Sequence, residues 1–168
     1  MKSLYLLRHA KATDKLATVD ALRPLSTNGI IDANLMFDAI KTKLQKPDLI
    51  ITSPALRAHH TALIFANCLS IDLNKIHTEA GLYLYHLQYL IDTIVQLPNE
   101  INVALLVGHN PHFEQLGTLL IPDLEKLPTS GLLEFKLENG WENLNQKSVL
   151  SYKMYLAAAF RNNQFKII

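Results

Sequence analysis

Three short polar clusters carry the side chains best suited to chemistry, and each of them follows an apolar stretch. In chain order they are Arg8-His9, then Ser53-Pro54 with Arg57, and finally Gly108-His109-Asn110-Pro111. Arginine stays protonated and offers a planar fork of donors that matches the oxygens of a phosphoryl group. A neutral imidazole is a competent nucleophile, and phosphoryl transfer depends above all on positioning and on charge neutralisation. The clusters therefore predict a nucleophile and an anion clamp that need no metal.

Each cluster taken alone has an ordinary structural explanation. A single histidine at the end of a strand is usually a hydrogen-bonded surface residue, and Arg57 alone would more often form a weak surface salt bridge. His59 and His60 lie close to Arg57, but neighbouring positions on a helix point in different directions, so a shared metal is not expected. His86 and His112 can be loop residues with ordinary partners. The functional interpretation depends on the three clusters lying together.

Alternating apolar runs and amphipathic stretches predict the elements that would bring these clusters together. Strands are expected over Ser3–Leu7, Leu49–Thr52, Lys75–Thr78, Val103–Val107, Leu132–Leu137 and Tyr152–Leu156. Helices are expected over Ser26–Leu44, with Ser26 as N-cap, and over Pro54–Cys68, Leu87–Leu97 and Phe113–Leu120. This order indicates an α/β fold with a mostly parallel sheet covered on both faces. Ligands bind beyond the carboxyl ends of such strands, so the clusters should meet there, bordered by the loops Ala10–Leu25 and Asp123–Thr129.

The composition is that of one globular domain with no excess of basic residues. The chain has 168 residues, of which 49% are hydrophobic and 18% are charged, and its formal net charge is +1. Bulk charge therefore predicts neither nucleic acid nor a membrane surface as partner, and no apolar run approaches the ~20 residues of a membrane span. Cys68 is the single cysteine, and a packed apolar role is expected for it. We expect a cytoplasmic protein with residues 1–168 in a single domain.

The polar clusters also match a known family. Leu6-Leu7-Arg8-His9-Ala10 resembles the Arg-His signature of the histidine phosphatase (phosphoglycerate mutase-like) superfamily. The resemblance continues through Arg23-Pro24-Leu25-Ser26 with Gly29, Ser53-Pro54-Ala55-Leu56-Arg57-Ala58, Glu79 with Leu82-Tyr83, and Gly108-His109-Asn110-Pro111. The last motif and the short chain are most similar to the SixA-type phosphohistidine phosphatases. The resemblance implies a Rossmann-like, three-layer α/β/α sandwich and no cofactor.

The resemblance also implies a role for each matching residue. His9 would be the nucleophile, and Arg8, Arg57 and His109 would hold the phosphoryl oxygens, with His109 as a cation. Substrate binding would extend to Arg23, Ser53 and Asn110, and Glu79 is the candidate general acid by position. The second ring nitrogen of His9 should be fixed by a backbone carbonyl, which sets the tautomer. No metal enters this scheme.

The substrate is left open between two classes. About fifty residues separate Arg57 from His109, which leaves little room for the inserted segments that cover the site in the mutase and large acid phosphatase branches. An open site would admit phosphohistidine on a protein, such as a phosphorelay or phosphotransferase-system protein, and equally a small phosphoester. A non-catalytic phosphate-binding module is a third, weaker possibility. A dinucleotide-binding domain is disfavoured because no Gly-x-Gly-x-x-Gly follows the first strand.

Overall fold

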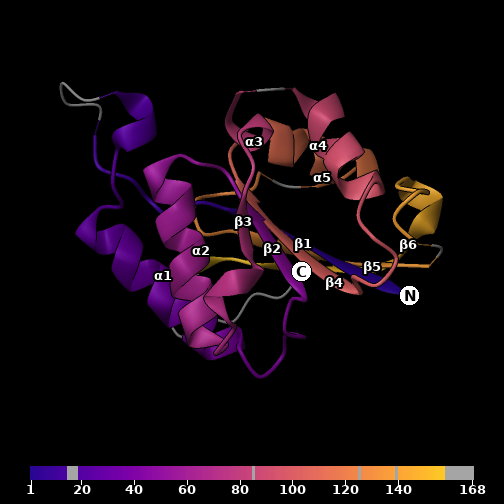
Figure 1. The fold of residues 1–168 in the computed structure, drawn as a ribbon, viewed down its shortest axis with the longest axis horizontal. Coiled ribbons are helices and arrows are strands. Elements are labelled where there is room, and N and C mark those ends of the chain that lie inside the picture. Colours follow the sequence, from indigo (N-terminus) through magenta and orange to yellow (C-terminus); the bar gives the residue numbers. More distant parts are fainter. Residues whose placement is uncertain (15–18, 85, 125, 139, 158–168) are drawn as a thin grey trace.

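The computed structural model describes residues 1–14, 19–84, 86–124, 126–138 and 140–157, which form a six-stranded sheet between two layers of helices (Figure 1). The strands are β1 (Lys2–Arg8), β2 (Leu49–Thr52), β3 (Ile76–Thr78), β4 (Val103–Gly108), β5 (Leu132–Leu137) and β6 (Val149–Tyr155). Their order across the sheet is β3-β2-β4-β1-β5-β6. The first four are parallel to one another, whereas β5 pairs antiparallel with both β1 and β6. The predicted α/β/α sandwich with a mostly parallel sheet is confirmed.

The two helical layers are explained by the alternation of side chains along the central strands. Tyr5 and Leu7 of β1 point to the core under α1 (Thr27–Ile40) and α2 (Leu56–Cys68), where Phe37 and Phe65 pack edge to face. Leu4 and Leu6 point to the opposite core. That core lies under α3 (Gly81–Leu84), α4 (Leu87–Val95) and α5 (His112–Leu120). Both faces of β1 are therefore buried, as its unbroken apolar run predicts.

Element ends differ from the predictions in a few places. Ser26 caps α1 as predicted, because its hydroxyl accepts a hydrogen bond from the Gly29 N–H, but α1 ends at Ile40 rather than Leu44. Strand β6 begins at Val149, three residues before the predicted start, on the exposed edge of the sheet. The short helix α3 and the 3₁₀ turns η1 (Asp20–Leu22), η2 (Leu73–Lys75) and η3 (Gln146–Ser148) were not predicted. No helix in the described part of the chain is long and apolar enough to cross a bilayer.

Candidate active site

Three parallel strands bring the polar clusters to one edge of the sheet. Arg8 lies opposite Gly108 in the ladder between β1 and β4, and Thr52 of β2 lies opposite Val107. Backbone pairing continues one residue past the strands, because the His9 N–H donates to the Gly108 carbonyl at 3.0 Å. As a result, the rings of His9 and His109 lie with their centroids 4.9 Å apart. The convergence expected from the strand pattern is present.

His9 is held as a neutral imidazole with one nitrogen available for attack. Its Nδ1–H donates to the Ala10 carbonyl at 2.7 Å, which leaves the lone pair on Nε2. The Arg57 Nε–H donates to this Nε2 at 3.3 Å. Burial lowers the pKa of His9 to about 4, and the positive charges of Arg57, Arg8 and Arg23 act in the same direction, while the Ala10 carbonyl opposes them. His9 is therefore unprotonated at neutral pH, which is the state that nucleophilic attack by an imidazole requires.

His109 is also neutral, which corrects the expectation of a cation. Burial is the largest cause and lowers its pKa to about 3, and the charge of Arg57 adds to the effect. The Ser53 hydroxyl lies 2.8 Å from His109 Nε2 and accepts a hydrogen bond from the Ala55 N–H. The hydroxyl can therefore donate its own hydrogen bond to Nε2. The ring proton of His109 then lies on Nδ1, a buried atom without a partner. An unpartnered buried donor beside a nucleophile suits the oxygen of a bound phosphoryl group.

Both arginines of the clamp are placed by neighbouring backbone atoms. Arg8 donates through Nη1 to the Leu127 carbonyl at 2.8 Å, whereas its buried Nε has no partner in the described part of the chain. Arg57 is only 7% exposed and lies in the first turn of α2. The Thr61 hydroxyl ties this turn to the loop after β1, since it donates to the Arg57 carbonyl and accepts from the Ala10 N–H. The sequence motif from Ser53 to Thr61 thus fixes Arg57 relative to His9.

The far wall of the site comes from the segment that leads into β5. Because β5 runs antiparallel to β1, it begins where β1 ends, and the Arg8 N–H donates to the Gly131 carbonyl at 3.0 Å. The Ser130 N–H donates to the His9 carbonyl at 3.2 Å. The Leu127 carbonyl, which holds Arg8, also accepts from Asn110 Nδ2 at 2.9 Å. The predicted bordering loop therefore supports two of the clusters directly, although residue 125 lies outside the described residues.

Two residues that sequence reasoning missed close the other side of the site. The Asp20 carboxylate accepts hydrogen bonds at 2.9 Å from Arg57 Nη2 and from the Tyr83 hydroxyl. The Tyr83 ring lies 5.5 Å from the ring of His109, between centroids. Hydrogen bonds from Arg23, above all, hold the pKa of Asp20 below its usual range, so the carboxylate is ionised. For Asp20 the sequence signal was its spacing from Arg23, which allows a short-range ion pair, and for Tyr83 it was the Leu82-Tyr83 motif of the resemblance, to which no role was assigned.

The structure places the remaining predicted residues around the site rather than at His9. Arg23 reaches the site through Asp20, at 2.9 Å, and otherwise donates to the Thr13 carbonyl. Residues 15–18 of this predicted bordering loop lie outside the described residues. Asn110 binds the Leu127 carbonyl through Nδ2, and its buried Oδ1 has no partner within the described ranges. Ser53 is fully buried, so it contacts His109 and not solvent.

Glu79 is not arranged as a general acid. Its carboxylate accepts hydrogen bonds from the Tyr89 hydroxyl at 2.7 Å and from the Gly81 N–H at 3.0 Å. Both interactions lower its pKa, Tyr89 more than Gly81. A group that donates a proton near neutral pH needs a raised pKa. The contacts of Glu79 instead hold the turn into α3.

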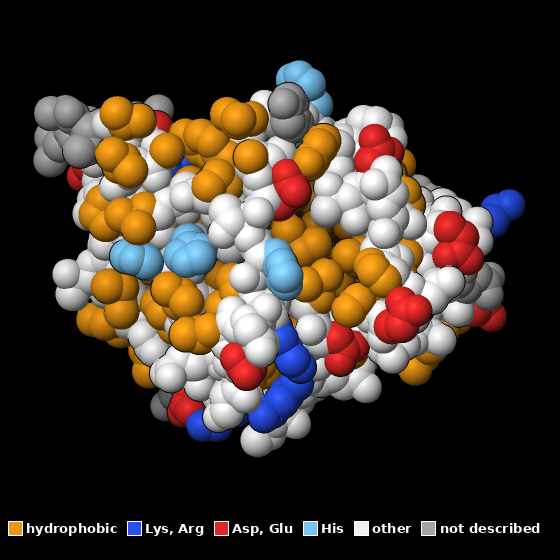
Figure 2. Space-filling view, in the orientation of Figure 1, with side chains coloured by type: hydrophobic (Ala, Val, Ile, Leu, Met, Phe, Trp, Pro, Cys, Tyr) orange, Lys and Arg blue, Asp and Glu red, His pale blue; other side chains and the backbone are white. Residues whose placement is uncertain are grey.

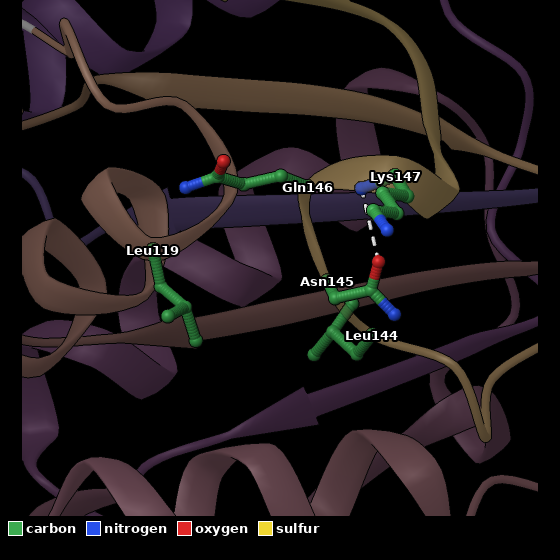
Figure 3. A pocket seen from close by; sticks show the side chains of 5 residues that line it. All are labelled: Leu119, Leu144, Asn145, Gln146 and Lys147. Carbon is green, nitrogen blue, oxygen red and sulfur yellow. Dashed lines mark hydrogen bonds between the residues drawn. The ribbon is translucent and has the colours of Figure 1, made fainter.

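Other polar groups and hollows lie apart from this chemistry. The rings of His86 and His112 pack edge to face with their centroids 6.3 Å apart. Burial is the larger cause that lowers the pKa of His112, and the neighbouring His86 adds to it. Within the described ranges, no three His, Cys, Asp or Glu side chains gather as a metal site would require. A surface cleft of about 500 Å³ lies between α5 and η3, lined by Leu119, Leu144, Asn145, Gln146 and Lys147 (Figure 3). It holds no nucleophile or acid, so the cluster around His9 remains the candidate active site.

Comparison with known proteins agrees with this geometry. Residues 4–83 match the family model of the histidine phosphatase superfamily, branch 1, a range that holds the Arg8, His9 and Arg57 motifs. The structure superimposes on SixA of Agrobacterium tumefaciens with a TM-score of 0.74 at 28% identity, covering 81% of this chain and 92% of that one. Residues 4–83 thus match the histidine phosphatase superfamily, and the fold of the chain is similar to that of a SixA protein.

Similarity to SixA proteins recurs in two further comparisons. Phosphohistidine phosphatase SixA of Escherichia coli is 32% identical over 68 residues, which are 40% of this chain and 42% of that protein. The aligned segment thus spans less than half the length of this curated relative. A SixA protein histidine phosphatase solved with tungstate has a TM-score of 0.78 at 23% identity, covering 93% of this chain and 97% of that one. The last likeness establishes the fold.

Proposed function

We propose that the chain is a histidine phosphatase that hydrolyses phosphohistidine on a protein, through a covalent phosphohistidine on His9. The observation that carries the proposal is the state of the His9 ring, with Nδ1–H bound to the Ala10 carbonyl and Nε2 unprotonated, its lone pair facing the Arg57 Nε–H. Arg8 Nε and His109 Nδ1 are buried atoms without hydrogen-bond partners among the described residues. A phosphoryl group bound at Nε2 would supply acceptors for such donors.

The reaction would take two steps. The Nε2 lone pair of His9 attacks phosphorus, a P–N bond forms, and the P–N bond to the substrate imidazole breaks. Water then attacks the phosphorus of phospho-His9, which releases inorganic phosphate and restores the neutral ring. Arg8, Arg57 and the His109 N–H stabilise the charge of the transferring group in both steps.

The leaving group favours phosphohistidine over a phosphomonoester. An imidazole leaving group is basic and takes a proton readily, whereas an alkoxide needs a general acid. Glu79, the residue expected to supply that proton, is ionised and bound to Tyr89 and Gly81. The arrangement therefore supports a substrate that needs no dedicated acid, in agreement with the name of the E. coli relative.

The surroundings of the site favour a protein substrate. In the described residues only η2, β3, α3 and α4 lie between α2 and β4, so no separate covering domain is inserted there. Three large apolar side chains flank Asp20 and Tyr83 and stay exposed, namely Val19 (68%), Leu22 (60%) and Leu84 (64%). Apolar side chains are widespread on the face shown in Figure 2. Such an apolar rim suits contact with a folded partner better than with a sugar phosphate.

Trapping of the phosphoenzyme tests the proposal. The chain is mixed with a ³²P-phosphohistidine protein and quenched in alkaline denaturant, because an N-phosphoryl bond is labile in acid. We expect label on His9, loss of the label in His9→Asn, and retention in the control His59→Asn. A panel with phosphohistidine protein, sugar phosphates and p-nitrophenyl phosphate ranks the substrates by kcat/KM. Label on another residue, or His9→Asn activity near wild type, would refute the nucleophile; preference for sugar phosphates would refute the substrate.

A further inference from the structure

A negatively charged side chain binds the guanidinium group of Arg57 in the anion clamp. Arg57 donates through Nη1 to the Asp20 backbone carbonyl at 2.7 Å and through Nη2 to its carboxylate at 2.9 Å. The second carboxylate oxygen of Asp20 accepts from Arg23 Nη1, also at 2.9 Å. The Tyr83 hydroxyl completes the set. Arg57, which the site offers to a phosphoryl group, and the adjacent Arg23 are thus already bound to a carboxylate.

The segment that carries Asp20 is held mainly by these polar contacts. None of the residues of η1 is buried, and Val19 and Leu22 on either side of Asp20 are largely exposed. The Asp20 side chain itself is 39% exposed, so solvent can replace its partners. Apolar burial contributes little to holding this segment in place. The position of η1 depends instead on ion pairs with arginines, and a phosphoryl substrate would bind to the same kind of charge.

Competition follows from the charges involved. A phosphoryl group bound at His9 Nε2 would lie beside Arg57 Nε, and its oxygens would accept hydrogen bonds from the same guanidinium group. If Asp20 stays in place, its negative charge repels the phosphoryl group in a partly buried site. If it leaves, its ion pairs with Arg57 and Arg23 are lost. Either way, the carboxylate opposes binding of the phosphoryl group.

We propose that Asp20 is a gating residue that competes with phosphoryl groups for Arg57 and Arg23, weakening the binding of free phosphate and favouring its release. The inference rests on the proposed function, because it assumes that a phosphoryl group binds at Arg57. A phosphoprotein can offset the competition through contacts outside the clamp, such as the apolar rim of Val19, Leu22 and Leu84. Free inorganic phosphate has no such contacts, so the returning carboxylate displaces the product.

Asp20→Asn is the direct test, since the amide keeps the shape and removes the charge. Orthovanadate and inorganic phosphate are titrated into the full chain by calorimetry, with Asp38→Asn on the last turn of α1 as a control for net charge. We expect the Kd for both anions to fall about tenfold in Asp20→Asn, equivalent to about 1.4 kcal/mol, and to stay unchanged in Asp38→Asn. Tyr83→Phe, which loosens the carboxylate, should lower both Kd values by a smaller factor. Unchanged or weaker binding in Asp20→Asn would assign Asp20 to positioning Arg57 and overturn the proposal.

A second measurement uses the wild-type chain and does not depend on a variant that folds. Hydrogen exchange is followed at the amides of Leu22 and Arg23, which donate to the Val19 and Asp20 carbonyls in η1. Vanadate should speed exchange at both amides if it releases Asp20, and slower or unchanged exchange would contradict release. Absence of vanadate binding to the wild-type chain would count against the proposed function itself. Vanadate binding to the wild-type chain, without the expected change of Kd in Asp20→Asn, would count only against the gating role of Asp20.

Discussion

The low pKa of His9 has a measurable consequence for the acid side of the pH profile. Burial and three nearby arginines bring this pKa to about 4, against ~6.5 for an unperturbed histidine. The difference corresponds to about 3 kcal/mol of preference for the neutral ring. At pH 5, ~90% of His9 would be neutral, compared with ~3% for an ordinary histidine. We therefore predict that kcat/KM for a phosphohistidine protein stays near its plateau at pH 5 and reaches half of it near pH 4.

An NMR titration separates the nucleophile from the ionisation of the substrate. The His9 Cε1–H signal of the ligand-free chain is assigned by its absence in His9→Gln and followed from pH 7.5 to pH 3.5. The same chain unfolded in urea supplies the reference near pH 6.5. A midpoint about two units below the reference is expected. A midpoint at or above the reference would refute the claim that desolvation dominates the charge state of His9.

Three further predictions concern stability and the groups behind the site. Because the folded pKa values of His9 and His109 lie below ~6.5, the unfolded chain binds more protons than the folded chain in acid. The free energy of unfolding, measured with urea, should therefore fall as the pH drops from about 6.5 towards 4, by about 3 kcal/mol from His9 alone. Ser53→Ala removes the partner of His109 and should lower kcat/KM about tenfold with an unchanged fold. Thr61→Val leaves the buried Ala10 N–H without an acceptor and should cost about 1–3 kcal/mol of unfolding free energy.

Distinct outcomes would contradict each of these expectations. A urea midpoint that is constant between pH 7 and pH 4 would mean that the two imidazoles are solvated in the folded chain. Full activity of Ser53→Ala, with Ser130→Ala as a control hydroxyl, would show that His109 is oriented by its ring contacts with His9 and Tyr83. A wild-type unfolding free energy in Thr61→Val would mean that the Ala10 N–H finds another acceptor.

The strands and the core of the site could be predicted because they depend on local patterns. Val103–Gly108 is apolar without interruption and is buried along its whole length. The end of each such strand carries a polar cluster, so parallel pairing alone brought His9, Arg57 and His109 together. The start of β6 was missed because its first residues lie at the exposed edge, where no apolar alternation marks them.

The charge state of His109 and the position of Asp20 could not be predicted, because both depend on tertiary contacts. A histidine in an anion site suggests a cation, but burial beside Arg57 and His9 reverses that expectation. Asp20 reaches Arg57 only because η1 folds back over the start of α2, and the sequence separates them by 37 positions. Glu79 had the residue type of an acid, while its partners Tyr89 and Gly81 give it another role.

The one strand that runs opposite to the other five, β5, makes one wall of the site replaceable. The residues from Asp123 to Thr129 lead into β5 and touch the catalytic edge through the carbonyl of Leu127, whereas His9, Arg57 and His109 belong to other strand ends. Natural variation in the length or chemistry of that connection can therefore change which molecules bind at this edge of the sheet, while His9, Arg57 and His109 keep their positions. Diversity of substrates within this architecture can arise by exchanging one loop, without rebuilding the machinery beneath it.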